Sequence, residues 1–370
     1  MLLTKLTKIV LFWLVGLLAA DIAFAQASYK FTEIKTPHET ATNLFGINDA
    51  GVMSGNYTDS GGVSHCFIRM RSTVTTIVDP NENTGGGTQC YGINNGGAIV
   101  GGYSAGNFSN GFLHLNGVFS DIIPPTSVGT TAYGVNDAGW VVGTFIDNVA
   151  QHGFVYDGST YTTLDAPGTT NGATLAIAIN SSNLITVQAY NSSGALTSYL
   201  FDGTNWSPLS VPNAVSTAVH QINNRGEIAI SWYDSGNVAH GAILADGVYY
   251  VNDDPSGTNT TIHGINNKNE IVGSYLPAGA SQLQGYKGLN TPTILSFSPP
   301  SGPVGTRVTI NGTGFTQTTR VSFGGRNDAT FTVDSDSKVT ATVRTNSRSG
   351  EIKVSTPAGV ATSATSFTVD

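Results

Sequence analysis

Short alternating runs of apolar and polar residues, separated by turn residues, fill residues 26–290 and indicate β-strands rather than helices. The pattern recurs six times, and each copy contains a motif such as Tyr133-Gly134-Val135-Asn136. Successive copies of the motif asparagine are 46, 42, 44, 43 and 43 residues apart. Four short strands in a repeat of this length are typical of the blades of a β-propeller.

Turn residues separate the expected strands within each repeat. In the third copy Asn136 is followed three residues later by Gly139, and both residue types suit a tight turn. Further strands are expected over residues 140–145, 152–156 and 161–164, the last of them shortly before Pro167. Each repeat therefore predicts one four-stranded antiparallel sheet.

The strand count differs between the two ends of the repeat region. The sixth copy passes from Gln284-Gly285-Tyr286 into a different sequence without a fourth strand, whereas residues 30–37 resemble the fourth strands of the other copies. A ring of blades avoids unpaired strand edges only when it is closed, so we predict that residues 30–37 complete the sixth blade. The expected fold class is all-β, with a six-bladed β-propeller over residues 26–290 closed by its N-terminal strand.

Residues 291–370 follow a different pattern. Alternating segments such as Val308-Thr309-Ile310 are separated by Gly and Asn turns over about 80 residues. This spacing predicts an immunoglobulin-like β-sandwich as the second domain.

The first 25 residues have the features of a signal peptide. Lys5 and Lys8 precede an apolar run over residues 9–20, and Ala23-Phe24-Ala25 provides a small-residue cleavage site before Gln26. The apolar run is well short of the roughly 20 residues that span a bilayer. We expect an exported protein, secreted or at the periplasm or cell surface, without membrane insertion after cleavage.

Charge is unevenly distributed along the chain. Residues 26–290 contain seven basic and 18 acidic residues, whereas residues 291–370 contain seven basic and five acidic residues. The acidic propeller should repel phosphate backbones, so we expect no nucleic-acid partner. We also expect a monomer without a cofactor.

Cys66 and Cys90 are the only cysteines in the sequence. They could form a disulfide in an oxidising compartment, or could be two small buried residues of the repeat.

Two parts of the chain resemble known families. The segments Gly46-Ile47-Asn48-Asp49-Ala50-Gly51, Asn136-Asp137-Ala138-Gly139 and His152-Gly153-Phe154 resemble the HAF extracellular repeats of bacterial exported proteins. This resemblance covers residues 26–290 and implies export and a repeat fold, without a settled activity. The fourth repeat departs most from it, so a less regular blade is expected there. Residues 291–370 resemble an IPT/TIG domain, a module that serves as a spacer or as an adhesion or carbohydrate-associated unit.

Two sets of repeated residues are candidates for binding. The first is a polar face of motif asparagines that could bind sugar hydroxyls or could only hold turns: Asn48, Asn94, Asn136, Asn180, Asn223 and Asn266. The second set stands two residues before each repeated Ile or Val and would lie near the axis: Phe45, Tyr91, Tyr133, Ile177, His220 and His263. We take Tyr91, Tyr133, His220 and His263 as the candidate ligand-binding pocket, with packing between blades as the alternative.

Other chemistry is poorly represented in the sequence. His65, His152 and His240 fall on alternate blades, too far apart to share a metal ion, and no catalytic motif is present. A pair of carboxylates that meet only in space would leave no sequence signature. We therefore expect an exported, non-catalytic recognition or scaffold protein. The propeller end face would bind an extracellular glycan or a surface protein, and the second domain would be a spacer. The alternative is a secreted polysaccharide-acting enzyme.

Overall fold

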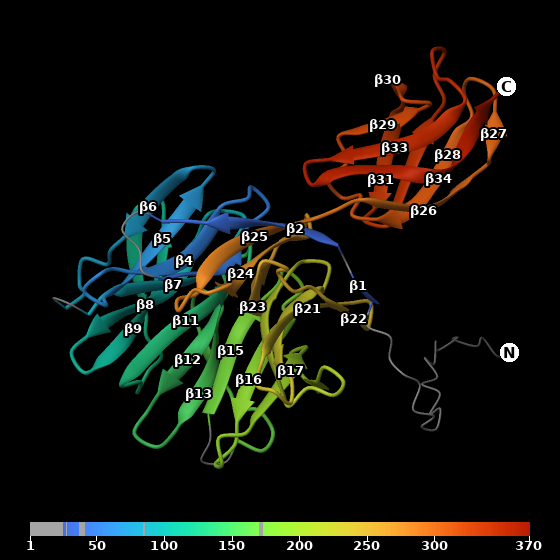
Figure 1. The fold of residues 1–370 in the computed structure, drawn as a ribbon. Helices are drawn as coiled ribbons and strands as arrows, with labels where there is room; N and C mark the ends of the chain where they lie inside the picture. The colour runs from blue at the N-terminus through green and yellow to red at the C-terminus, as the bar shows by residue number, and fades with distance from the viewer. Residues whose placement is uncertain (1–24, 27, 37–40, 84–85, 170–172) are drawn as a thin grey trace, which may run out of the picture.

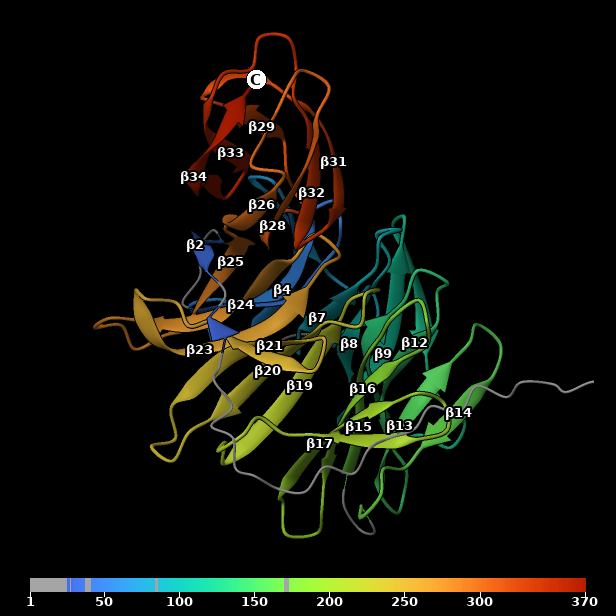
Figure 2. The same cartoon turned by 90° about the vertical axis from the view of Figure 1, so that its right-hand side faces the viewer.

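The computed structural model describes residues 25–26, 28–36, 41–83, 86–169 and 173–370, which form strands β1–β34 and contain no helix (Figures 1 and 2). None of the described segments is therefore a helix long and apolar enough to cross a bilayer. The predicted signal peptide lies outside the described residues, except for Ala25, and stays a prediction.

Six four-stranded antiparallel blades form the propeller, as the repeat predicts, and one parallel pair, Gln151 with Ala173, joins blades three and four into a single 8-stranded sheet. Blade one consists of β3 (Ala41–Ile47), β4 (Met53–Thr58), β5 (Ser64–Met70) and β6 (Thr73–Ile77). Blade two consists of β7 (Thr88–Ile93), β8 (Ile99–Ala105), β9 (Phe108–Leu115) and β10 (Val118–Ile122). Blade three consists of β11 (Gly129–Val135), β12 (Val141–Ile146), β13 (Gln151–Tyr156) and β14 (Tyr161–Leu164).

The second half of the ring continues the same order. Blade four consists of β15 (Ala173–Ile179), β16 (Ile185–Tyr190), β17 (Leu196–Phe201) and β18 (Trp206–Leu209). Blade five consists of β19 (Ser216–Ile222), β20 (Ile228–Tyr233), β21 (Ala239–Ala245) and β22 (Val248–Val251). Blade six contains β23 (Gly257–Ile265), β24 (Glu270–Pro277) and β25 (Gln284–Asn290). Blade four has all four strands despite its divergent sequence.

The sixth blade is completed by β2 (Tyr29–Ile34), which confirms the predicted closure. β2 pairs antiparallel with β25, from Tyr29 opposite Asn290 to Ile34 opposite Gly285. Figure 1 shows the blue β2 beside the orange β25, two segments that are far apart in the sequence. The short β1 (Ala25–Gln26) pairs with the outer strand of blade five and spans the predicted cleavage position.

Glycines in the second strands make room for aromatic rings on the third strands. Gly55, Gly101, Gly143 and Gly273 stand opposite the fully buried rings of Phe67, Phe112, Phe154 and Tyr286. Blade five reverses the sizes, because Ile230 there faces Ala242. Five of the six blades thus place one small and one large residue opposite each other at this position, which suits close packing.

Neighbouring glycines on β8 provide a test of this packing. A Cβ on Gly101 would overlap the carbonyl oxygen of Gln89 and the ring of Phe112, whereas a Cβ on Gly102 would come no closer than 3.6 Å to any atom. Gly101→Ala is expected to lower the free energy of unfolding by about 1–3 kcal/mol. Gly102→Ala should leave it unchanged or raise it by about 0.4–1 kcal/mol. Denaturant titration of the two variants checks this, and equal stabilities would contradict the packing argument.

The second domain is a two-sheet sandwich. One sheet has the order β26 (Thr293–Ser298), β28 (Arg307–Thr313), β32 (Lys338–Thr342) and β31 (Thr330–Ser335). The other has the order β27 (Ser301–Gly302), β34 (Gly359–Val369), β33 (Gly350–Thr356), β29 (Arg320–Phe323) and β30 (Arg326–Asp328). Phe315, Phe323 and Phe367 are fully buried in its core.

Hydrogen bonds join the second domain to the end of the propeller that carries the motif asparagines. Asn290 donates to Asp336 at 3.3 Å, and Gln317 donates to the carbonyl oxygen of Lys268 at 3.4 Å. The backbone nitrogen of Thr291 donates to the carbonyl oxygen of Ser28 at 2.8 Å, beside β2. The second domain therefore contacts the propeller at Lys268 as well as beside the linker.

Candidate functional site

The six motif asparagines form a closed ring of hydrogen bonds around the propeller axis. Each Nδ2 donates to the backbone carbonyl of the corresponding asparagine in the next blade, at 2.9–3.3 Å, and Asn266 completes the circle on Asn48. Each Oδ1 also holds its own turn, as Asn136 does by accepting from the backbone nitrogens of Ala138 and Trp140.

All six asparagine side chains are buried, which bears on the hypothesis of a sugar-binding polar face. Their amides are used to hold turns and to join neighbouring blades, so the structure favours the turn interpretation. The next residue of most repeats adds a second layer of polar side chains. In that layer Asp137 accepts from Asn95 at 3.0 Å and from Asn224 at 3.2 Å. The cavity at this end of the axis is only about 40 Å³.

Aromatic and imidazole rings line the axis on the other side of the asparagine ring. His220, His263, Phe45, Tyr91 and Tyr133, which we call the aromatic arc, follow one another with centroids 4.7, 5.1, 5.2 and 4.9 Å apart. Ile177 occupies the sixth position and separates the two ends of the arc. The structure thus brings together the four residues predicted for the pocket.

A β-bulge sets the direction of these side chains. The pairing between the first and second strands shifts in register at this point in all six blades, for example between Ala132 and Gly134. A bulge leaves one residue out of the ladder and redirects its side chain. Tyr133 is that residue in blade three. Its equivalents in the other blades are Phe45, Tyr91, Ile177, His220 and His263. The sequence periodicity located these residues without revealing the bulge.

The aromatic arc forms most of the wall of a cavity of about 210 Å³ on the propeller axis. Leu175, Gln188 and Gln221 also line it and were not identified from the sequence. Gln221 replaces the Gly or Ala of the motif, a difference that could have drawn attention to it. Among the described residues, the lining contains no carboxylate. The cavity therefore combines apolar rings with a few neutral polar groups.

Burial keeps the two imidazoles neutral. The pKa of His263 is lowered to about 4, mainly by loss of water around the ring, and its Nδ1 donates to the carbonyl oxygen of Leu44 at 3.0 Å. The pKa of His220 is lowered well below its usual value by burial and by the neighbouring His263. Burial also raises the pKa of Tyr133 to about 12. At neutral pH the wall of the cavity is uncharged.

The depressed pKa of His263 predicts acid-sensitive stability. In the unfolded chain this imidazole titrates near its ordinary pKa of about 6.5. The contribution of His263 to the free energy of unfolding is therefore fully present above that pH and is lost as the pH falls toward 4. The loss attributable to His263 is expected to be on the order of 3 kcal/mol. Unfolding titrations at pH 7.5 and 4.5 should show a smaller loss for His263→Phe, which copies Phe45 of blade one. Equal losses would contradict the assignment.

The three histidines on alternate blades are each held within their own blade. His65 lies 2.9 Å from Asp59, and His152 lies between Asp165 at 2.7 Å and Asp147 at 3.5 Å. His240 lies in the same way between Asp253 and Asp234. At His152 and at His240 the two aspartates bind opposite ring nitrogens. Within the described part of the chain, no group of three or more His, Cys, Asp and Glu side chains could hold a metal ion.

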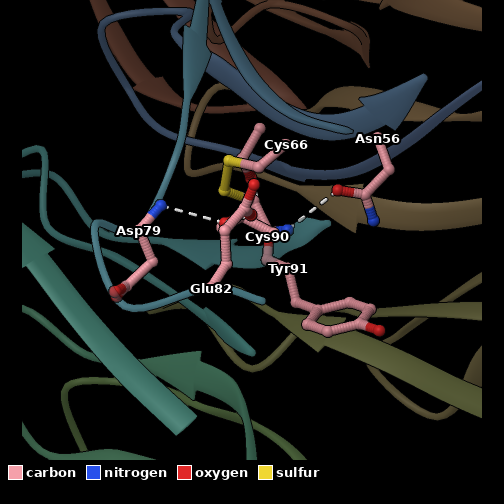
Figure 3. The surroundings of a disulfide bond; sticks show 8 residues. Asn56, Cys66, Asp79, Glu82, Cys90 and Tyr91 are labelled. Carbon is pink, nitrogen blue, oxygen red and sulfur yellow. Dashed lines mark hydrogen bonds between the residues drawn. A yellow bond between two sulfur atoms is a disulfide. The ribbon is translucent and has the colours of Figure 1, made fainter. Parts of the chain in front are cut away.

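A disulfide includes Cys90, the residue that precedes Tyr91 of the aromatic arc. Cys66 on β5 and Cys90 on β7 are bonded and fully buried, so the bridge joins blade one to blade two (Figure 3). The backbone nitrogen of Cys90 donates to Asn56 at 2.8 Å, a second link between these blades. Figure 3 shows the ring of Tyr91, the next residue, turned away from the disulfide. The bridge anchors the strand that positions Tyr91.

Comparisons with known proteins find a family model that matches the second domain and solved structures that are similar to part of the chain. A search of curated proteins finds no match. The propeller is similar to a lectin from Aleuria aurantia described as a six-bladed β-propeller, with 14% identity and a TM-score of 0.44 over 68% of this chain and 93% of the lectin. It is also similar to SapL1 lectin in complex with α-methyl fucoside, with 10% identity and a TM-score of 0.45 over 68% and 94% of the two chains. TolB from Acinetobacter baumannii is similar at 11% identity, with a TM-score of 0.44 over 68% and 64%. Residues 292–369 match the IPT/TIG domain family, so the second domain of this chain is an IPT/TIG domain.

Proposed function

We propose that the protein is an exported, non-catalytic recognition protein whose propeller binds a neutral sugar residue of a glycan in the axial cavity. The observation that carries this proposal is the aromatic arc around an uncharged cavity. Ring faces provide apolar contact for the carbon-bearing faces of a sugar, and a few fixed polar groups can orient its hydroxyls.

The size and charge of the cavity restrict the ligand. Its volume of about 210 Å³ is below the roughly 300 Å³ at which pockets for drug-sized ligands begin, so one sugar residue fits better than a longer segment. The imidazoles are neutral and the propeller carries a net charge of −11, which disfavours an acidic sugar at this position. A terminal neutral sugar residue is the ligand that agrees with both properties.

The lining also supports a role without catalysis. Glycoside cleavage ordinarily uses two carboxylates on either side of the bond. Among the described residues that line the axial cavity, none is Asp or Glu. Binding without cleavage is therefore the activity that this cavity supports best.

The position of the second domain supports a spacer role. The linker leaves the propeller at Asn290, opposite Tyr29, at the end that carries the asparagine ring. The aromatic arc lies on the other side of that ring along the axis. We propose that the IPT/TIG domain holds the propeller away from an attachment point, with the axial cavity facing outward.

Export is part of the same proposal. The signal-peptide pattern of residues 1–25 supports it, and a buried disulfide is typical of proteins that fold in an oxidising compartment. The HAF-like repeats would then belong to an extracellular or periplasmic monomer.

Glycan binding by the chain of residues 26–370 tests the proposal. A neutral glycan selected on an array should bind at least about 30-fold more weakly after Tyr91, Tyr133, His220 and His263 are changed together to Ala, because buried aromatic contacts commonly carry 2 kcal/mol or more. The control changes Tyr156 and Tyr161 to Ala, a stacked pair on outer strands with centroids 4.4 Å apart.

Two results would count against this function. Unchanged affinity in the variant with all four residues changed to Ala, together with an intact melting transition, would show that the axial cavity is not the binding site. New reducing ends released from the bound glycan would show catalysis and support the polysaccharide-acting alternative.

A further inference from the structure

Basic side chains of the propeller are concentrated on three neighbouring blades. Residues 72–224 contain no Lys or Arg, and all seven basic residues of the propeller belong to blades one, five and six or to their connections. Three of these seven, Arg71, Lys268 and Lys287, line one cavity of about 240 Å³. It lies where blade six, closed by β2, meets blade one, and it is separate from the axial cavity.

The two acidic residues in this cavity already have partners. Glu270 binds Lys287 at 2.9 Å and accepts from Asn266 at 2.7 Å. Asp49 accepts from the backbone and side-chain nitrogens of Asn267, both at 2.8 Å. These contacts leave positive charge on the other side chains of the wall.

Arg71 and Lys268 supply that positive charge. Both residues are exposed, and their side chains form no hydrogen bond or ion pair with the residues that the structure describes. Two cations that have no partner among the described residues therefore face the same cavity as Lys287. A cavity with this balance favours an anion.

The backbone of Arg71 is unusual for an arginine. It has a φ of +57° in the two-residue loop between β5 and β6, a position that ordinarily takes Gly or Asn. The corresponding hairpins of blades two to five contain Asn-Gly or Asp-Gly: Asn116-Gly117, Asp157-Gly158, Asp202-Gly203 and Asp246-Gly247. An unfavourable backbone conformation kept at a ligand-sized cavity is an observation from which a functional role can be inferred.

We propose that this cavity binds the carboxylate of an acidic sugar residue of the uronic acid type. The guanidinium of Arg71 can form paired hydrogen bonds with a carboxylate, and Lys268 and Lys287 add charge around it. The inference does not depend on the axial cavity, because the two sites share no lining residue.

The surroundings restrict the ligand further. The net charge of −11 on the propeller repels dense polyanions, so a glycan with widely spaced acidic units fits better than a nucleic acid. Gln317 of the second domain donates to the carbonyl oxygen of Lys268 beside the cavity. The second domain carries a net charge of +2 and lies next to the proposed site.

Titration calorimetry with D-glucuronate, D-glucose and inorganic sulfate tests the proposal on residues 26–370. D-glucuronate should bind to the parent protein, and the double variant Arg71→Gly/Lys268→Gln should weaken that binding at least about tenfold. Glycine suits the φ of residue 71, so the variant should retain its stability. The control Lys30→Gln removes one basic charge of blade six outside the cavity lining and should leave the affinity nearly unchanged.

The outcomes separate this proposal from its alternatives. Tighter binding of sulfate than of glucuronate, lost in the same double variant, would overturn the carboxylate assignment and make a sulfated sugar the ligand of this cavity. No binding of either anion to the parent protein, or equal binding by parent and double variant, would overturn the site. Glucuronate binding should persist in the variant with four residues of the aromatic arc changed to Ala. A failure of the proposed axial site can therefore be distinguished from a failure of this anion site.

Discussion

Deletion of residues 26–38 is expected to abolish the cooperative unfolding of the propeller. The deletion removes β2, which forms all six residue pairs with β25 along the outer edge of blade six. Phe31 and Ile34 pack in the interior, and the ring of Phe31 lies 5.0 Å from that of Tyr286. Without β2, blade six keeps three strands, exposes a long unpaired edge and loses the packing of Ile34 against blade one. The lost interactions are comparable with the whole stability of a typical domain, about 5–15 kcal/mol.

Calorimetry and circular dichroism of the purified chain measure this effect. A chain that begins at Ser28 is the control, because it loses β1 and keeps β2. A synthetic peptide of residues 26–38 should restore the transition when added to the deleted chain, since an added strand can pair with an open sheet edge. A sharp, unshifted melt of the deleted chain would show that closure by β2 does not hold the ring together.

Loss of the Cys66–Cys90 disulfide is expected to lower the free energy of unfolding by about 3 to 4 kcal/mol. The bridge connects cysteines 24 residues apart, with Cα atoms 5.0 Å from each other, and it restricts the unfolded chain. Both cysteines are fully buried, so replacing both by Ala removes the bond while keeping small apolar residues in place.

Denaturant unfolding of the parent protein, with and without reductant, and of the Cys66→Ala/Cys90→Ala variant measures the effect. The reduced parent and the variant should have similar midpoints, both below that of the oxidised parent. If reduction leaves the midpoint unchanged, the hydrogen bond from Cys90 to Asn56 and the surrounding packing hold the two blades together without the bond. The glycan affinity of the variant would also show how far the bridge positions Tyr91.

The sequence was most informative where the chain repeats itself. Six copies of one pattern predict six blades, because each copy meets the same local requirements for strands and turns. The missing fourth strand of the last copy and the matching segment at residues 30–37 predict the closure that β2 and β25 form. The four predicted pocket residues also follow from the period alone, because equivalent positions of a ring meet on its axis.

The roles of the repeated polar residues could not be predicted from the repeat period. The amides of the asparagine ring reach the carbonyls of the next blade, a distance set by how tightly the blades pack around the axis. The sequence identifies the turn that each asparagine holds, but not the carbonyl in the next blade to which its amide donates. The bulge at Tyr133 was likewise invisible, because one extra residue in a strand changes the direction of a side chain without changing the repeat length.

The sequence by itself therefore determined the number of blades, the strand that closes the ring and the residues that meet on its axis. These properties depend on local alternation and on repetition. Only the tertiary structure decided which polar groups are already bonded and which remain available to a ligand. Arg71 and Lys268 are nearly 200 residues apart in the sequence and face one cavity because β2 closes the ring between their blades. Proximity of that kind arises from the closed fold and has no counterpart in the local pattern of the chain.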